Sequence, residues 1–243
     1  MRSETTLESA HWEHRLLGFL GGRAPEVVMP LAGPEPAEDG RVASLLPYVE
    51  GAQLDRDDPA QRLELAALLA RLHRAGLDWD GGPRPGVPAF RDVDFVANRW
   101  WDWRRVPKTP VLVAAYEASV DFLFDPPPLV LGAVHGDVYR GNFRVREGRV
   151  AGVLDWEDAR VDWPAWELAN ATWEVCKLGD DLDPARAEPF LAAYAQAGGP
   201  GETGPFRELL RLRLLVDALY SLSREQHDPD YAAHLLRALE RLP

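Results

Sequence analysis

Residues 135–142 read HGDVYRGN, and residues 153–157 read VLDWE. The first stretch places four residues between Asp137 and Asn142, and Asp155 follows after a short intervening segment. That segment predicts a strand over 142–146, a turn at 147–149 and a second strand over 150–154. A hairpin of this length returns Asp155 to the side of Asn142. We therefore expect the polar groups of both stretches to form one site.

The polar groups in these stretches match the needs of phosphoryl transfer, which depends on positioning and charge neutralisation more than on covalent chemistry. A carboxylate beside the acceptor hydroxyl takes its proton, and metal ions neutralise the phosphate oxygens. Mg²⁺ prefers oxygen ligands. Protein kinases meet these needs with an Asp, four intervening residues, an Asn and a later Asp. The two stretches thus predict a base, a metal-ligand amide and a metal-ligand carboxylate.

The stretches resemble the aminoglycoside phosphotransferase and choline kinase superfamily, whose pattern is H-G-D-x-x-x-x-N followed by a hydrophobic-D-W/F-E segment. The resemblance implies that Asp137 is the catalytic base and that His135 supports the catalytic loop. It also implies that Asn142 and Asp155 bind Mg²⁺, while Glu157 is structural or faces the substrate. The implied fold is α+β and protein-kinase-like. The implied activity is transfer from MgATP (or GTP) to a hydroxyl of a small molecule, such as an aminoglycoside or an amino alcohol.

Each of these residues also has an alternative role. Asp137 could cap a turn, Asn142 could begin a strand, and Asp155 could form an Asx turn. A zinc site at His135 and Asp137 would need a second His or Cys, and none lies close in the sequence. A metal-dependent phosphoesterase and a catalytically silent kinase-like binding protein stay open as functions. The combination of Asp137, Asn142 and Asp155 at this spacing favours phosphoryl transfer.

The N-terminal region is expected to form a partial nucleotide lobe over residues 1–50, before a helical catalytic and substrate lobe over 51–243. Pro47, Tyr48 and Val49 resemble the hinge between the lobes, where backbone groups bind adenine. The alternative for this segment is an ordinary buried strand. Glu13, in the first predicted helix, resembles the glutamate that pairs with the nucleotide-clamping lysine of kinase-like enzymes.

That lysine and the Gly-rich loop are missing, because residues 1–10 contain no glycine and no lysine precedes Lys108. The chain could be a truncated product, could use Arg15 or Arg41 against the phosphates, or could bind without catalysing. A lobe of so few strands leaves a sheet edge and apolar surface uncovered. We therefore expect self-association, for example as a homodimer, through residues 1–50.

The composition is that of an acidic globular chain. Its 243 residues carry a net charge of −12 and are 46% hydrophobic, which argues against a basic nucleic-acid-binding face. No apolar run suits a membrane span or a signal peptide. The single Cys176 falls in an apolar helical pattern, so we expect a buried inert thiol and a cytoplasmic location.

Periodicity, first-turn prolines and terminal glycines predict most of the remaining elements. A short strand is expected over 26–31, a loop over 32–40, and a strand over 41–49. The expected helices span 8–20, 59–74, 94–103, 110–124, 164–177, 184–197, 205–223 and 229–242.

The acceptor pocket is expected among the C-terminal helices. Acidic groups would suit a polyamine sugar, and aromatic faces would suit a quaternary ammonium group. The candidates are Asp158, Asp162, Glu174, Asp217, Glu225, Trp163, Trp166 and Trp173. The seven-residue spacing of Trp166 and Trp173 favours core packing over an aromatic cage. The isolated histidines are expected to be surface or packing residues: His11, His14, His73, His227 and His234.

Overall fold

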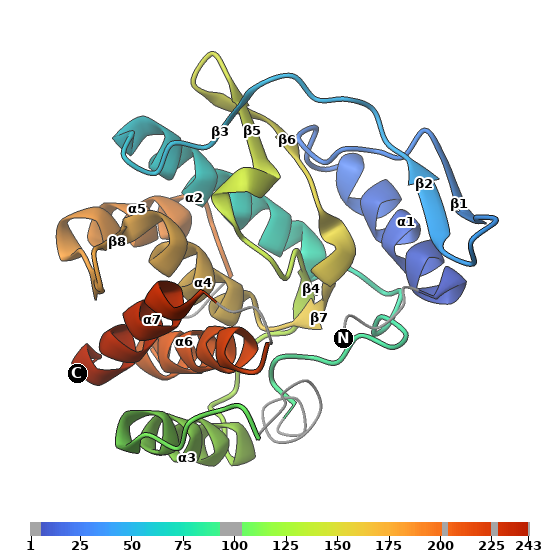
Figure 1. Ribbon diagram of the computed structural model, residues 1–243. Helices are drawn as coiled ribbons and strands as arrows, with labels where there is room; N and C mark the ends of the chain where they lie inside the picture. The colour runs from blue at the N-terminus through green and yellow to red at the C-terminus, as the bar shows by residue number, and fades with distance from the viewer. Residues whose placement is uncertain (1–5, 93–103, 201–203, 225–227, 243) are drawn as a thin grey trace.

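A computed structural model describes residues 6–92, 104–200, 204–224 and 228–242 (Figure 1). In chain order its strands and helices are α1 (Leu7–Gly21), β1 (Ala32–Pro36), β2 (Val42–Leu45), β3 (Ala52–Gln53), α2 (Pro59–Gly76), α3 (Pro110–Phe124), β4 (Gly132–Val134), β5 (Phe143–Arg146), β6 (Arg149–Val153), β7 (Arg160–Asp162), α4 (Pro164–Cys176), β8 (Lys177–Leu178), β9 (Asp181–Leu182), α5 (Pro184–Gln196), α6 (Phe206–Leu222) and α7 (Pro229–Arg241). Two short 3-10 turns, η2 (Arg140–Asn142) and η3 (Trp156–Asp158), lie at the ends of the two sequence stretches that predict the site.

The helix predictions inside the described residues are confirmed, because their caps are local. Asp58, Asp183 and Asp228 each accept hydrogen bonds from the first-turn backbone N–H groups of α2, α5 and α7. Each of these helices has a proline in its first turn, where no N–H is needed. The predicted helix over 94–103 lies outside the described residues.

The strand predictions for the N-terminal region are partly wrong. Residues 26–31 pair with β6 only at an isolated parallel bridge between Val27 and Val153, and the backbone nitrogen of Leu31 donates to the carbonyl oxygen of Leu45. One bridge on one strand is too short a contact to make this segment a strand. Residues 32–36, predicted as a loop, form β1 and pair with β2 in an antiparallel hairpin. Prolines are tolerated in β1 because it is an edge strand. Of the predicted strand over 41–49, only residues 42–45 pair.

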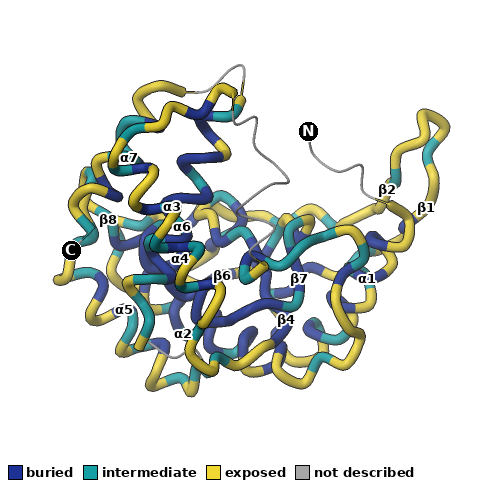
Figure 2. Tube along the Cα trace, turned by 90° about the horizontal axis from the view of Figure 1, so that it is seen from below, coloured by how far each residue is buried: buried dark blue, intermediate teal, exposed yellow. Residues whose placement is uncertain are grey.

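The β1–β2 hairpin projects from the body of the molecule, as Figure 2 shows. Beyond it the chain runs on without regular structure to residue 50, and Tyr48 is 90% exposed. The alternative of a buried strand at residues 46–49 is therefore wrong. Helix α1 shares one hydrophobic cluster with α2 and the β5–β6 hairpin, and the division of the chain at residue 50 stays a prediction.

The predicted hairpin over 142–154 is confirmed. Strands β5 and β6 pair antiparallel, and β3 adds to the other edge of β5. Glu147 and Gly148 connect β5 to β6 with φ values of 54° and 76°. Two central residues with positive φ match the twist of the paired strands. The turn fixes the register in which Phe143 opposes Val153.

Helix α4 contributes side chains to both hydrophobic clusters of the molecule. Its Leu168, Ala171 and Val175 pack in the cluster with α2 and α5, whereas Trp166 and Trp173 pack in the cluster with α3, α6 and α7. The two tryptophans are thus core residues, as their spacing predicts. Every residue of α4 except Glu174 is buried.

Cys176 closes α4 and is also buried. Burial raises the pKa of its thiol to about 12, which confirms the prediction of an inert side chain. No helix in the described ranges combines the length and apolarity that crossing a lipid bilayer requires.

Candidate active site

Residues 135–142 form a loop that directly follows β4, which pairs with β7. We call this segment the catalytic loop, after the role that the sequence predicts for it. Gly136 has a φ of 86°, and a Cβ at this position would collide with the carbonyl oxygen of Asp158. Only glycine fits this combination of positive φ and close backbone approach. The glycine of the H-G-D stretch thus lets the loop pass close to the segment after Asp155 and turn Asp137 outward.

His135 connects the two stretches that the sequence places in one site. Its Nε2 lies 2.8 Å from the carbonyl oxygen of Leu154, and its Nδ1 lies 3.2 Å from the backbone nitrogen of Asp137. The carbonyl can only accept and the N–H can only donate, so the proton of a neutral ring is on Nε2. His135 therefore holds the backbone beside Asp155 at a fixed position relative to Asp137.

This bonding leaves no nitrogen of His135 free to bind a metal ion. Within the part of the chain that the structure describes, no group of three or more His, Cys, Asp or Glu side chains is arranged so that it could hold a metal ion. Zinc sites use such groups of nitrogen, sulfur and carboxylate ligands. The zinc alternative thus lacks its ligands among the described residues.

Asp137 and Asn142 contact each other directly. The Asn142 Nδ2 donates to Asp137 Oδ2 over 3.1 Å and to the Asp137 carbonyl oxygen over 3.0 Å. With its nitrogen turned toward Asp137, the amide of Asn142 keeps its oxygen for a cation. The backbone nitrogen of Leu154 donates to the carbonyl oxygen of Asn142 over 2.8 Å. Asn142 therefore lies next to the residue that precedes Asp155.

Asp155 adopts left-handed backbone angles, with φ 61° and ψ 66°. Such a conformation is uncommon for a residue other than glycine and is concentrated at functional sites. The side chain is exposed, while the following Trp156 is buried and its indole N–H donates to Val153 O. The amide oxygen of Asn142 and the carboxylate of Asp155 are hard oxygen ligands, and the hairpin brings their backbones together. This donor set fits Mg²⁺, which keeps waters and phosphate oxygens as its other ligands.

A buried carboxylate from α4 supports the catalytic loop, and sequence reasoning missed its role. Glu167 accepts from the backbone nitrogens of His135 and Gly136 over 3.2 and 2.5 Å, and it lies 2.7 Å from His73 Nε2. His73 Nδ1 in turn lies 2.7 Å from the hydroxyl of Tyr194 on α5. His73 is thus a buried network residue rather than an isolated one. Burial favours a raised pKa, but the His73 hydrogen bond and nearby positive charge outweigh it and lower the pKa of Glu167.

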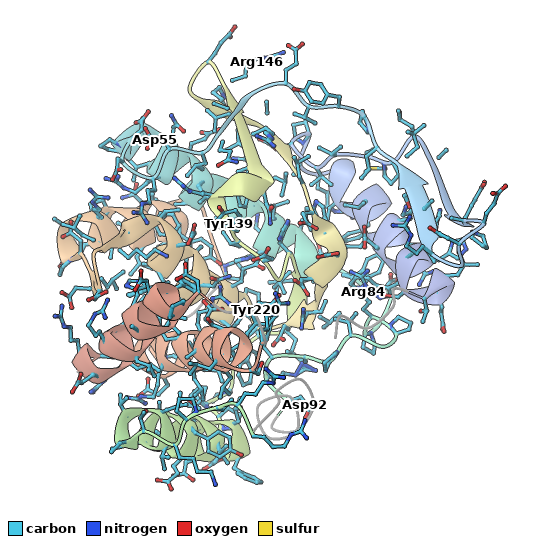
Figure 3. All side chains as sticks on the ribbon, in the orientation of Figure 1. Asp55, Arg84, Asp92, Tyr139, Arg146 and Tyr220 are labelled. Atoms are coloured by element: carbon cyan, nitrogen blue, oxygen red, sulfur yellow. The ribbon has the colours of Figure 1, made fainter. Side chains whose placement is uncertain are left out.

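Glu13 on α1 pairs with Arg84 instead of a lysine. Their side chains meet at 2.7 Å, and Arg84 is almost fully buried beside α1 (Figure 3). The same guanidinium donates to the carbonyl oxygens of Trp156 and Ala159 over 2.9 and 3.2 Å. Arg84 thereby connects α1 to the segment that follows Asp155. It lies in a Gly/Pro-rich loop without a motif, so no sequence signal points to it.

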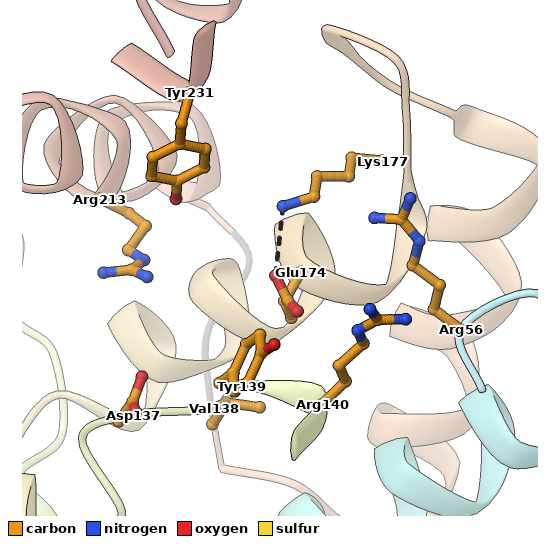
Figure 4. Close-up of a pocket in the computed structure, with 9 residues that line it drawn as sticks. All are labelled: Arg56, Asp137, Val138, Tyr139, Arg140, Glu174, Lys177, Arg213 and Tyr231. Atoms are coloured by element: carbon orange, nitrogen blue, oxygen red, sulfur yellow. Dashed lines mark hydrogen bonds and ion pairs between the residues drawn. The ribbon is translucent and has the colours of Figure 1, made fainter. Parts of the chain in front are cut away.

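A pocket of about 330 Å³ opens above Asp137, as Figure 4 shows. Its walls come from the catalytic loop, the segment before α2, and helices α4, α6 and α7. The lining residues are Arg56, Asp137, Val138, Tyr139, Arg140, Glu174, Lys177, Arg213 and Tyr231.

Only some of the acceptor candidates from the sequence lie at this pocket. Glu174 lines it, and Asp217 lies beside it, paired with Arg213. Burial raises the pKa of Asp217. Asp162 is instead buried beneath the loop before residue 93, where it accepts from the backbone nitrogens of Phe90 and Trp163. Asp158 pairs with Arg160, and Glu225 lies outside the described residues.

The other described histidines are surface or packing residues, as expected. His234 on α7 stacks on Trp173 and pairs with Asp180 at 2.5 Å. His14 lies 2.8 Å from the hydroxyl of Ser44 on β2. His11 is exposed, as expected for a surface residue, and His227 lies outside the described ranges.

Comparison with known proteins gives the family. The family model described as "Phosphotransferase enzyme family" matches residues 1–215. The chain belongs to this family. A curated member, the homoserine kinase of Methylobacillus glycogenes, is 30% identical over 209 residues, which cover 78% of this chain and 62% of that protein. The chain therefore spans less than two thirds of the length of this relative.

Two solved structures of phosphotransferases share the fold. The macrolide 2′-phosphotransferase of Brachybacterium faecium aligns with a TM-score of 0.62 at 22% identity, over 99% of this chain and 82% of its own. A thermostable mutant of an aminoglycoside phosphotransferase, in a ternary complex with AMP-PNP and hygromycin B, aligns with a TM-score of 0.68 at 19% identity, over 98% and 83%. This family member therefore has the predicted α+β, protein-kinase-like fold, with a reduced N-terminal β lobe and a mostly helical C-terminal lobe.

Proposed function

We propose that this chain is a MgATP-dependent phosphotransferase that acts on a hydroxyl of a small molecule bound in the pocket above Asp137. The observation that carries the proposal is the contact between Asp137 and Asn142 beside the hairpin that ends at Asp155. One carboxylate faces a pocket, and two hard oxygen ligands lie next to it on the same loop and hairpin. Phosphoryl transfer needs this combination of acceptor base and metal ligands.

Asp137 is the catalytic base in this proposal. Asn142 occupies Asp137 Oδ2 with a hydrogen bond, and this contact orients the carboxylate toward the pocket. The other oxygen accepts the hydrogen bond of the acceptor hydroxyl and takes its proton as the new bond from the hydroxyl oxygen to the γ-phosphorus of ATP forms. The bond from the γ-phosphorus to the β–γ bridging oxygen breaks, and ADP leaves. His135 acts as a positioning residue, because it holds the backbone of both stretches without contacting the substrate.

Asn142 and Asp155 are the proposed ligands of Mg²⁺, which neutralises phosphate charge when bound. Pro47, Tyr48 and Val49 are the proposed adenine contacts. No hydrogen bond joins the backbone of these three residues to any residue in the described ranges. Their C=O groups and the N–H groups of Tyr48 and Val49 are therefore available to adenine. Glu13 stays a proposed nucleotide-side residue, with Arg84 supplying positive charge beside it.

Known relatives supply candidates for the acceptor. The curated relative above is a homoserine kinase, and one structural neighbour holds hygromycin B. We infer that this chain likewise takes a hydroxylated metabolite or an antibiotic-like molecule from solution. A cytoplasmic location stays a prediction, supported by the requirement for ATP and by the buried thiol of Cys176.

We expect Asp155→Asn to abolish phosphotransfer and to weaken MgATP binding. The change removes one negative charge from a proposed metal ligand while keeping its size. Calorimetric titration of MgATP into both proteins, followed by an acceptor screen, provides the measurement. Asp125→Asn, an exposed residue at the end of α3, is the matched control. Wild-type turnover in Asp155→Asn would exclude the proposed metal site.

A catalytically silent kinase-like binding protein is the second candidate function. The observation in its favour is the replacement of the usual lysine–glutamate pair by Arg84 and Glu13, because a guanidinium lacks the compact geometry of an ammonium group. Saturable MgATP binding without transfer to any acceptor would support this candidate. Cleavage of a generic phosphoester without ATP would instead indicate a hydrolase.

We also propose that the chain self-associates through residues 1–50. An N-terminal apolar patch, defined as Met29, Leu31, Leu45, Leu46 and Tyr48, is exposed on and beside the β1–β2 hairpin. Light scattering is expected to show a dimer that dissociates in a Leu31→Glu/Leu45→Glu variant, because burying these charges is costly. Phe124→Glu, at an equally exposed apolar residue of α3, serves as the control. A monomer at high concentration would contradict this proposal.

A further inference from the structure

The pocket above Asp137 is basic, although the chain as a whole has a net charge of −12. Four cationic side chains line it, from Arg56, Arg140, Lys177 and Arg213. Only two carboxylates line it, from Asp137 and Glu174. Because Asp137 is the proposed base, Glu174 is the one lining carboxylate left to balance these cations.

The cations come from four different elements and not from one charged helix face. Arg56 precedes α2, Arg140 follows the base in the catalytic loop, Lys177 follows α4, and Arg213 lies on α6. Figure 4 shows Arg56, Arg140 and Lys177 on one side of the pocket, with Asp137 on the other. We name these three residues the basic triad. Convergence of like charges from separate elements costs energy unless an anion balances them.

Local carboxylates balance the basic triad only in part. Lys177 pairs with Glu174 at 3.2 Å. Neither Arg56 nor Arg140 forms an ion pair with a carboxylate in the ranges that the structure describes. On the opposite wall Arg213 pairs with Asp217, yet its Nε is buried without a hydrogen-bond partner among the described residues. A bound molecule with an anionic group would supply the missing acceptors.

We infer that the acceptor of this phosphotransferase is a small hydroxylated molecule with an anionic group, a carboxylate or a phosphate. Its hydroxyl lies at Asp137 and its anionic group at the basic triad. The guanidinium groups of Arg56 and Arg140 suit both kinds of group, because each can donate two parallel N–H bonds. A pocket of about 330 Å³ holds a molecule of this size. A polycationic sugar would place its ammonium groups against the triad.

This inference rests on the proposed function, and pairs of acceptors that differ in one anionic group test it. One pair is a four-carbon hydroxy acid and its amide, and the other is glycerol 3-phosphate and glycerol. Transfer from MgATP is measured for each. We expect kcat/KM for the anionic member of one pair to exceed that of its neutral match by about ten- to a hundredfold, the effect of one lost charge-assisted hydrogen bond. The pair that shows the preference identifies the anion.

The Arg56→Gln variant tests whether the basic triad causes the preference for anionic acceptors. The variant is expected to raise KM for the anionic acceptor about tenfold or more. KM for the neutral acceptor and the affinity for MgATP are expected to stay unchanged. Arg146→Gln, at the exposed tip of the β5–β6 hairpin (Figure 3), is the matched control. If Arg56→Gln weakens MgATP binding and spares the acceptor, the triad serves the nucleotide and the inference is wrong.

Failure of the inference can be separated from failure of the proposed function. Transfer to neutral or cationic acceptors in preference to anionic ones overturns the inference and keeps the function. If no acceptor is phosphorylated, calorimetric binding of the same pairs without nucleotide decides the question. Binding of the anionic member that is lost in Arg56→Gln supports the basic triad as an anion site, and equal or absent binding of both members overturns it.

Discussion

Asp137→Asn is expected to lower kcat by about 10²- to 10⁴-fold, the usual contribution of a positioned general base. The asparagine side chain can present its oxygen to Asn142 Nδ2, which donates to Asp137 Oδ2 over 3.1 Å. The loop should therefore keep its structure while losing the group that takes the acceptor proton. Steady-state kinetics with saturating MgATP and acceptor give the change in kcat.

Two further measurements separate loss of the base from loss of the site. MgATP affinity and the unfolding midpoint should stay close to those of the unaltered protein, because Asn142 and Asp155 are untouched. Asp125→Asn, outside the pocket, should change none of these quantities. A drop in kcat of less than about threefold would mean that Asp137 does not take the proton during the rate-limiting step.

Glu167→Gln is expected to cost about 1–3 kcal/mol of unfolding free energy, the usual effect of leaving a buried hydrogen-bonding group without its partner. Glu167 accepts from three nitrogens, those of His135, Gly136 and the His73 ring. A glutamine has only one oxygen, so its NH₂ group would face one of these donors. The catalytic loop should also shift, and kcat should fall with it. Urea unfolding at neutral pH measures the first effect.

The same residue predicts a dependence of stability on pH. The pKa of Glu167 is lowered in the folded protein, so its stabilisation is complete above the pKa of an unfolded glutamate. The stabilisation is lost as the pH falls through the lower, folded value. The unaltered protein should therefore lose stability in acid more steeply than Glu167→Gln. Glu188→Gln, exposed on α5, is the control, and parallel pH profiles for all three proteins would contradict this role.

The parts of this molecule that sequence could predict are those set by neighbouring residues. Asp137, Asn142 and Asp155 lie in one site because a short hairpin joins them, and a hairpin is recognisable from alternation and turn residues. Helices α2, α3, α5 and α7 are equally local, since an Asp or Thr cap before a first-turn proline marks their starts.

The missed parts depend on contacts between distant residues. His73 and Glu167 are 94 positions apart, and Arg84 meets Glu13 across 71 positions. No sequence pattern relates residues that are this far apart in the chain. The strand at 32–36 was missed because proline argues against a strand, and only the tertiary structure shows that β1 is an edge. The basic pocket was missed because its cations come from four separate elements.

Helix α4 has a consequence for how this site can diversify. Its buried Glu167 hydrogen-bonds the backbone of His135 and Gly136, while Glu174 near its end and Lys177 just after it line the pocket. Core packing on both sides holds helix α4 in place. The helix therefore sets the distance between the loop that carries Asp137 and the pocket wall at Glu174 and Lys177. Glu174 and Lys177 belong to neither cluster, so they can be exchanged without repacking the core. Selection for a new acceptor can therefore act on the pocket wall while the phosphoryl-transfer machinery keeps its geometry.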